Sequence, residues 1–173
     1  MNKYVVAGFA GAALIAASAF AAEEKPTDPQ IAMIAVTADT VDINAAKLAS
    51  EKSSNAKVKE FADLMVRDHT SVNEQATALA KKLGVTPEES ATSRSLQSGG
   101  EKMMAKLKKI SGAEFDKAYV DNEVSYHEQV LAVLDKTLIP DAENSELKSL
   151  LESAQPIFLS HLNHAKELKA SLR

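Results

Sequence analysis

Residues 56–83 read AKVKEFADLMVRDHTSVNEQATALAKKL, and apolar side chains recur along them every three or four positions. This spacing places the apolar side chains on one face of an α-helix, so it predicts a helix that packs against other helices. His69 is the one polar member of the series, and Gly84 follows the stretch as a helix-terminating residue. The series consists of Val58, Ala62, Met65, His69, Val72, Ala76, Leu79 and Leu83.

Three other stretches, at about 28–52, 111–139 and 144–172, show the same period. The first opens on Asp28-Pro29, an N-cap residue followed by proline at the first helical position. Pro156 lies inside the last stretch and is expected to bend it. Four amphipathic helices of about 25 residues predict an all-α four-helix bundle. The three series are Ile34, Ala38, Val41, Ala45, Leu48; Asp116, Val120, Glu123, His127, Val130, Leu134; and Leu147, Leu150, Ala154, Ile157, His161, His164, Leu168.

The connector between the second and third long helices spans residues 84–110. It contains a Ser/Thr/Gly-rich stretch at 90–100, and a short amphipathic helix is expected at 101–110, with its lysines facing solvent. Ferritin-like bundles use one long crossover at this point of the chain, so we expect a ferritin-like topology with one short extra helix in the connector.

The composition restricts the class of protein. The chain has 173 residues, of which 45% are hydrophobic and 25% charged, as expected for one globular domain. It contains no cysteine, which excludes disulfides, thiolate metal sites and cysteine nucleophiles. The net charge of -4 is spread over interleaved acids and bases, a pattern that argues against nucleic-acid binding. No hydrolase triad spacing, phosphate loop or nucleotide fingerprint is present.

The N-terminus has the form of a secretory signal peptide. Lys3 provides the positive region, 5–17 is an apolar run of small residues, and Ala19-Phe20-Ala21 is a small-x-small cleavage pattern. We therefore expect a cleaved signal peptide at 1–21, an exposed leader at 22–27 and the bundle domain at 28–173. The protein would then be periplasmic or secreted and would have no membrane span after cleavage. A retained N-terminal anchor is the alternative, although the apolar run is short for a spanning helix.

The four histidines fall in or beside the inward-facing series of their helices. Several of them, together with acidic residues on neighbouring helices, lie near helix midpoints, and midpoints meet in a bundle whichever way the helices run. Helical bundles form metal sites from imidazole and carboxylate side chains that lie at the same level along the bundle axis. Imidazole is a suitable ligand for zinc, copper, nickel or iron. The predicted metal ligands are His69, Glu123, His127, His161 and His164, with Asp42 and Tyr119 supporting them.

Three motifs carry a resemblance to a known family. They are residues 58–62 (VKEFA) followed by 65–69 (MVRDH), Phe115-Asp116 followed by Tyr119 and His127, and residues 161–165 (HLNHA). In these motifs the chain, over about residues 28–168, resembles the bacterial family called domain of unknown function 4142. The resemblance implies an exported ferritin-like bundle and implies no particular activity.

Two main hypotheses about function follow, and neither makes the protein an enzyme. In the first, the bundle binds a transition-metal ion such as zinc, copper or iron, and buffers, carries or senses it. In the second, the histidines are structural and an envelope or stress protein acts through a surface for a protein partner of unknown identity. A di-iron-type oxidase ranks third, because the Glu-x-x-His motif of such proteins does not occur near these positions.

The cleavage pattern generates a first prediction. Because Ala19-Phe20-Ala21 is the only well-formed site, the mature protein should begin at Ala22. Intact-mass analysis of the protein from its native envelope fraction would measure this directly. An N-terminus at Met1 on membrane-bound protein would contradict the prediction.

Overall fold

The computed structural model describes residues 25–172. The predicted signal peptide and the first residues of the leader therefore lie outside the described residues. Within 25–172 every regular element is helical and no strand occurs. None of these helices is long and apolar enough to cross a membrane. The elements are α1 (Asp28–Lys52), α2 (Ala56–Leu83), α3 (Ala91–Leu107), α4 (Gly112–Val133), the π-helical turn η1 (Leu134–Leu138), α5 (Ile139–Asp141) and α6 (Ser145–Ser171).

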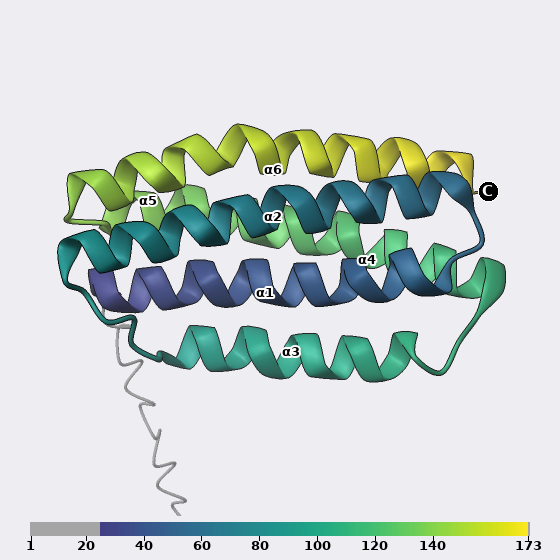
Figure 1. Ribbon diagram of the computed structural model, residues 1–173, viewed down its shortest axis with the longest axis horizontal. Helices are drawn as coiled ribbons and strands as arrows, with labels where there is room; N and C mark the ends of the chain where they lie inside the picture. The colour runs from purple at the N-terminus through teal and green to yellow at the C-terminus, as the bar shows by residue number, and fades with distance from the viewer. Residues whose placement is uncertain (1–24, 173) are drawn as a thin grey trace, which may run out of the picture.

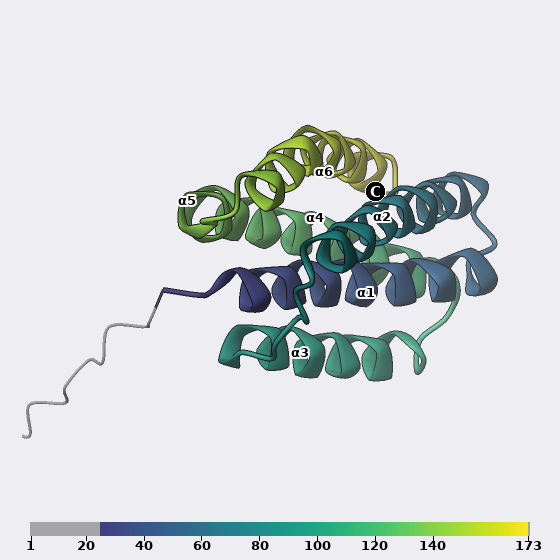
Figure 2. The same cartoon turned by 60° about the vertical axis from the view of Figure 1, so that its left-hand side comes forward.

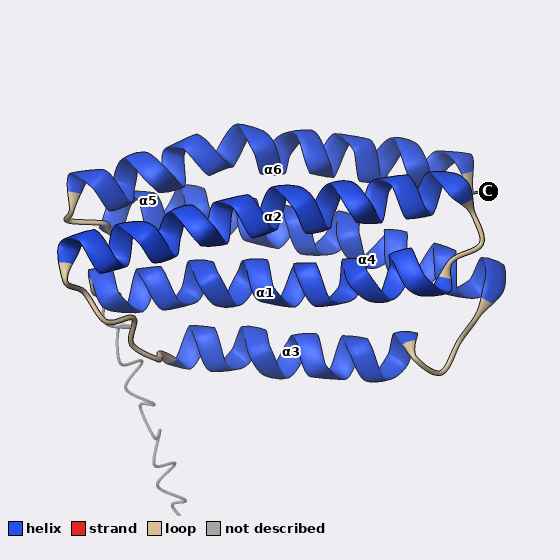
Figure 3. Cartoon of the chain, in the orientation of Figure 1, coloured by secondary structure: helices blue, strands red, loops and turns tan. Residues whose placement is uncertain are grey.

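The long helices α1, α2, α4 and α6 form a bundle, and α3 lies outside it along α1 (Figures 1 and 2). α1 packs mainly against α2, and α4 packs mainly against α6. The chain reverses direction from α1 to α2, and α3 then carries it back along the length of the bundle to the start of α4 (Figure 1). The four-helix bundle predicted from the sequence is thus present, with a fifth long helix beside it (Figure 3).

The helix ends follow from local side-chain chemistry. α1 is capped by Thr27, one residue before the expected Asp28, and the Thr27 backbone N–H donates to Gln30 Oε1 at 3.1 Å. The Asp28 carboxylate instead accepts from the backbone N–H groups of Glu143 (2.9 Å) and Asn144 (2.8 Å). Asp28 therefore ties the start of α1 to the start of α6, where carboxylate oxygens satisfy backbone donors that have no partner within the helix.

The connector differs from the expectation of a short helix at 101–110. α3 covers Ala91–Leu107, so the Ser/Thr/Gly-rich stretch is helical as well. Ser90 caps this helix by accepting from the Ser93 N–H at 3.1 Å. Gly100 is buried where α3 crosses α1, and a Cβ on it would come within 2.8 Å of Val41. The glycine therefore permits close helix packing here, which a reading of glycine as a helix breaker overlooks.

The C-terminal end of α3 is fixed by a lysine of α1. Lys52 Nζ donates to the carbonyl oxygens of Leu107 (3.0 Å) and Lys108 (2.8 Å), both of which lie past the last turn that can bond them internally. Only three residues of α3 are buried: Ser93, Gly100 and Leu107.

The apolar interior is divided into two clusters, one in each half of the bundle. The first is built around Phe61, Met65 and Phe115, and the second around Ile31, Leu151 and Phe158. Buried polar residues, among them His69 and His127, lie between these two apolar halves. These buried polar side chains form a layer near the middle of the four long helices, which we call the polar layer.

Two of the predicted helix faces were correct at only some of their positions. On α6 the buried residues are Leu151, Phe158 and Leu162, whereas Ile157 is 36% exposed. The predicted and the observed series on α6 both begin at Leu147 and advance by steps of three and four residues. Because residues 150 and 151 are both apolar, as are 157 and 158, the sequence pattern does not distinguish the two series. On α1, Ile34 and Ala45 are buried as predicted, but the rest of the buried face includes Asp39 and Asp42, and an apolar pattern does not indicate these two acids.

The register of α6 gives a second prediction. Leu151 is 4% exposed, so Leu151→Ala should lower the free energy of unfolding by about 2–5 kcal/mol. Leu150→Ala, at a half-buried neighbour, should cost clearly less. Urea unfolding of the two variants followed by circular dichroism measures both values. A larger loss at Leu150 would contradict the register of the structure.

Candidate metal centre

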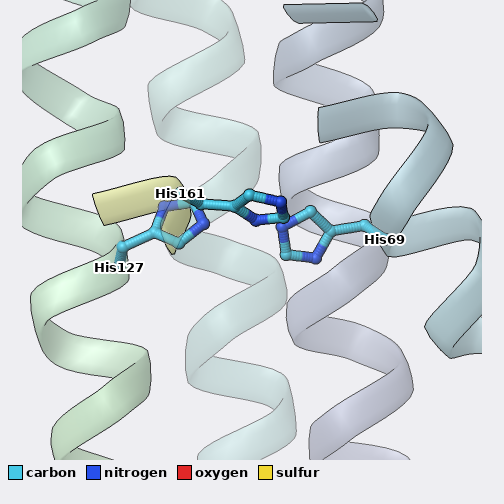
Figure 4. Close-up of side chains that lie close together, drawn as sticks. All are labelled: His69, His127 and His161. Carbon is cyan, nitrogen blue, oxygen red and sulfur yellow. The ribbon is translucent and has the colours of Figure 1, made fainter. Parts of the chain in front are cut away.

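Three histidines from three helices meet in the polar layer. His69 comes from α2, His127 from α4 and His161 from α6, and their rings converge (Figure 4). The ring centroids are 5.5 Å apart for His69 and His127, 5.2 Å for His69 and His161, and 5.5 Å for His127 and His161. One nitrogen of each ring lies within 4.8 Å of the chosen nitrogens of the other two, and all three side chains are buried. This spacing places three potential ligand atoms around one point.

In each ring, the nitrogen that faces away from the other two rings contacts an oxygen atom and so fixes the ring. We call it the outer nitrogen. His69 Nδ1 lies 2.7 Å from Asp39 Oδ1, and His161 Nε2 lies 3.0 Å from Asp68 Oδ2. His127 Nδ1 lies 3.0 Å from the Glu123 carbonyl oxygen. A carbonyl oxygen only accepts, so His127 Nδ1 donates its proton, and the ionised carboxylates favour the same role for the other two outer nitrogens.

The inner nitrogens of the rings have no hydrogen-bond partner. They are Nε2 of His69, Nε2 of His127 and Nδ1 of His161, and all three are buried. Buried polar atoms normally have a hydrogen-bond partner, so three such nitrogens in one place without one call for an explanation. An outer oxygen that fixes the ring and an inner nitrogen that faces a common point are the arrangement of histidines that bind metal ions.

Two carboxylates complete the layer. Asp42 Oδ2 lies 2.9 Å from His69 Nε2 and 3.5 Å from His127 Nε2, although neither contact is aligned as a hydrogen bond. Asp42, Glu123 and His127 form a second group whose ligand atoms lie within 4.8 Å of one another. Both Asp42 oxygens and Glu123 Oε2 are buried without a hydrogen-bond partner. A cation in the layer could therefore pair with oxygen as well as nitrogen.

The electrostatics separate the titratable groups. Burial opposes ionisation of Asp42, but His69 and His127 outweigh it and lower the Asp42 pKa to about 2. Burial likewise opposes a charge on His69, yet Asp42 and Asp39 raise its pKa to about 10. Burial lowers the pKa of His161 to about 4, and the hydrogen bond to Asp68 offsets this only in part.

The other two groups are also shifted by burial. Burial lowers the pKa of His127, and it raises the pKa of Glu123 well above the ordinary range, with a further contribution from the charge of Asp42. At neutral pH the metal-free layer therefore contains an imidazolium at His69 beside an ionised Asp42. An incoming cation would take the place of the His69 inner proton, since a metal and a proton compete for the same nitrogen.

The remaining two predicted site residues lie apart from the three rings. His164 is half-buried, and its ring meets Phe61 edge-on with the centroids 5.1 Å apart. Positions three apart on a helix differ by about 60° in direction, so His161 and His164 do not point to the same place. Tyr119 is fully buried in the cluster around Phe61, and its hydroxyl has no hydrogen-bond partner.

Comparison with known proteins gives the family. The family described as Domain of unknown function (DUF4142) matches residues 14–168. The protein belongs to the DUF4142 family. No curated protein and no solved structure matches the chain. The resemblance inferred from the sequence motifs is thus confirmed, and any function of this DUF4142 protein must be argued from its own residues.

Three residues of the site were missed by sequence reasoning. Asp39 and Asp68 position His69 and His161, and Phe158 stacks on the His69 ring with the centroids 4.8 Å apart. Asp39 lies three residues before Asp42, so the two acids share one face of α1, and this spacing was a usable signal. Asp68 carried no such signal, because it projects beside the inward series and also pairs with the exposed Arg67.

The separated pKa values generate a third prediction. In the metal-free protein, the His161 ring should stay neutral down to a pH of about 4, and the His69 ring should stay protonated up to about 10. An unfolded histidine titrates near 6.5. The contribution of His161 to stability therefore falls as pH drops from about 6.5 to 4, and that of His69 is lost as pH rises from about 6.5 to 10.

Ring carbon chemical shifts, followed by NMR over this pH range with a chelator present, give both values. Assignment uses the variants His69→Gln and His161→Gln. Titration of both rings near 6.5 would show that they do not face the partners described above.

Proposed function

We propose that this DUF4142 protein binds one divalent transition-metal ion in the polar layer. The ligands are the inner nitrogens of His69, His127 and His161, with oxygens from Asp42 and Glu123. The observation that carries the proposal is the orientation of the three rings. Each is fixed by an oxygen behind it, and each presents a buried nitrogen without a hydrogen-bond partner to the same small space, where the His69 nitrogen faces Asp42 at 2.9 Å. Asp42, which the sequence predicted to support the ligands, is thus proposed as a ligand itself.

The ligand chemistry supports a transition-metal ion over magnesium or calcium. Imidazole nitrogen with a few carboxylate oxygens suits zinc, iron or copper, whereas magnesium and calcium prefer oxygen ligands. The charge also fits: Asp42 is already ionised, and a bound dication would favour ionisation of Glu123, so that two carboxylates could balance its charge. The function we assign is to buffer, carry or sense the ion. We assign no reaction to the site.

The setting of the site is part of the proposal. The small-x-small pattern at Ala19-Phe20-Ala21 supports export, and so a periplasmic or secreted protein that meets metal ions outside the cytoplasm. The helical connector supports a ferritin-like topology. It returns the chain along the bundle between α2 and α4, as the single crossover of ferritin-like folds does.

One observation favours a structural role for the same histidines. His69 is fully enclosed by Asp39, Asp42 and the ring of Phe158, an arrangement that holds together without a metal ion. In that alternative the layer fixes how the helices pair, and the protein acts through its surface. The two functions differ in what a metal ion does to the stability of the fold.

Metal binding gives a fourth prediction. At an ion concentration about 100 times the dissociation constant, zinc, copper or iron should stabilise the fold by about 2.7 kcal/mol. For a domain of this size, this raises Tm by about 5–10 °C. The measurement is a calorimetric melt of tag-free protein with and without each ion, together with metal analysis of the protein as purified.

A matched pair of variants separates the two roles. His161→Ala should remove most of the metal-induced rise in Tm while changing the metal-free Tm little. His164→Ala removes the same side chain from the same helix, but outside the three rings, so it should leave the rise intact. The structural alternative predicts that His161→Ala lowers the metal-free stability by about 1–3 kcal/mol, because it removes a buried ring together with its hydrogen bond to Asp68. A wild-type melt indifferent to all these ions would end the metal proposal.

A further inference from the structure

A narrow apolar cavity lies inside the bundle, beside the polar layer. It encloses about 80 Å³ and is lined by side chains of α1, α2, α6 and the α4–η1 segment. It occupies the half of the bundle in which α1 and α6 begin. The lining includes Asp28 and Asn144 at that end, and Asp39 and Phe158 next to His69.

The residues that line the cavity extend along the bundle axis. Its lining runs from Val72 to Leu83 on α2 and from Leu147 to Phe158 on α6. Each of these stretches covers eleven helical steps, which corresponds to about 16 Å at 1.5 Å per residue. A volume this small over such a length describes a slot one chain wide.

The slot exists because small side chains face one another across it. Ala35 from α1, Ala76 from α2 and Ala154 from α6 all line it, where larger residues would fill the space between the helices. Close packing is the rule in protein interiors, and a void deprives its lining of contacts. Because the residues at these three positions are alanines, the space between the helices stays open.

The slot is not built to hold water. A water molecule needs two to four polar partners, and polar residues line the slot only at its two ends. Each of them already has a partner in the protein. Asp28 accepts from the backbone N–H groups of Glu143 and Asn144, Asn144 Oδ1 accepts from backbone N–H groups of α6, and Asp39 is bonded to His69.

We propose that this slot binds a straight aliphatic chain with an uncharged head group, such as the tail of a fatty alcohol, which enters at the end marked by Asp28 and Asn144. A compact apolar molecule would contact only part of a slot this long, and a charged group would find no partner along its walls. At the inner end, Asp39 and Phe158 separate the chain from the three histidines. The inference is independent of metal binding.

The test uses metal-free protein in the presence of a chelator, with primary alcohols from hexan-1-ol to dodecan-1-ol as probes. Calorimetric titration should show affinity rising about fourfold for each added methylene, as expected for apolar surface transferred out of water. The rise should stop once the chain reaches the inner wall. Because no metal is present, failure here leaves the metal proposal untouched, and failure of metal binding leaves the slot untouched.

Three alanines of α2 provide the variants. Ala76 lies four residues from the inner end, so Ala76→Leu should shorten the slot by about 6 Å. It should weaken decan-1-ol binding at least tenfold and hexan-1-ol binding much less. Ala80→Leu, nearer the entrance, should weaken both. Ala78→Leu, at an exposed position of the same helix, is the control and should change neither.

If Ala76→Leu does not give a cooperative melt, Ala80→Leu at its half-buried position decides the question. The inference is overturned if the wild-type protein binds none of the alcohols. It is equally overturned if affinity does not depend on chain length, or if the leucine variants in the slot bind the alcohols as the control does.

Discussion

The interior of this protein depends on the pairing of His69 with Asp39 and Asp42. The imidazole of α2 lies 2.7 Å and 2.9 Å from two carboxylates of α1, and all three side chains are shielded from water. Buried charges are tolerated only when they are paired, and removing one partner leaves the other charge uncompensated. α1 and α2 must therefore face each other at this level, and α4 and α6 close over the pair with His127 and His161.

Much of the fold could be predicted because helix periodicity and end signals are local properties of the chain. The bounds of α2 and the start of α6 follow from Asn55, Gly84 and Asn144, whose chemistry acts within a few residues. The register of α6 could not be predicted, because Leu150 and Leu151 are equally apolar and only contacts between helices, such as the stacking of Phe158 on His69, distinguish them. α3 was underestimated because glycine was read by propensity, while Gly100 is selected by its contact with Val41.

The sequence was sufficient to predict which histidines meet, but not the directions of their side chains or their hydrogen-bond partners. Midpoints of bundle helices coincide, so His69, His127 and His161 could be placed together without knowing the topology. To predict where a side chain points, the rotation of its helix must be known to better than one residue. Without that accuracy, His161 cannot be distinguished from His164. The outer partners of the rings depend on contacts between helices, as Asp68 with His161 shows, and no spacing within one helix reports them.

The shallow attachment of α3 has a consequence for motion. Its fully buried residues are Ser93, Gly100 and Leu107, and the carbonyl groups at its end are bonded by the single ammonium group of Lys52. A segment with so few buried contacts opens at a small fraction of the free energy needed to unfold the whole domain. We therefore expect the amide hydrogens of α3 to exchange with solvent more readily than those of the other four long helices, because α3 can separate from the bundle without unfolding it.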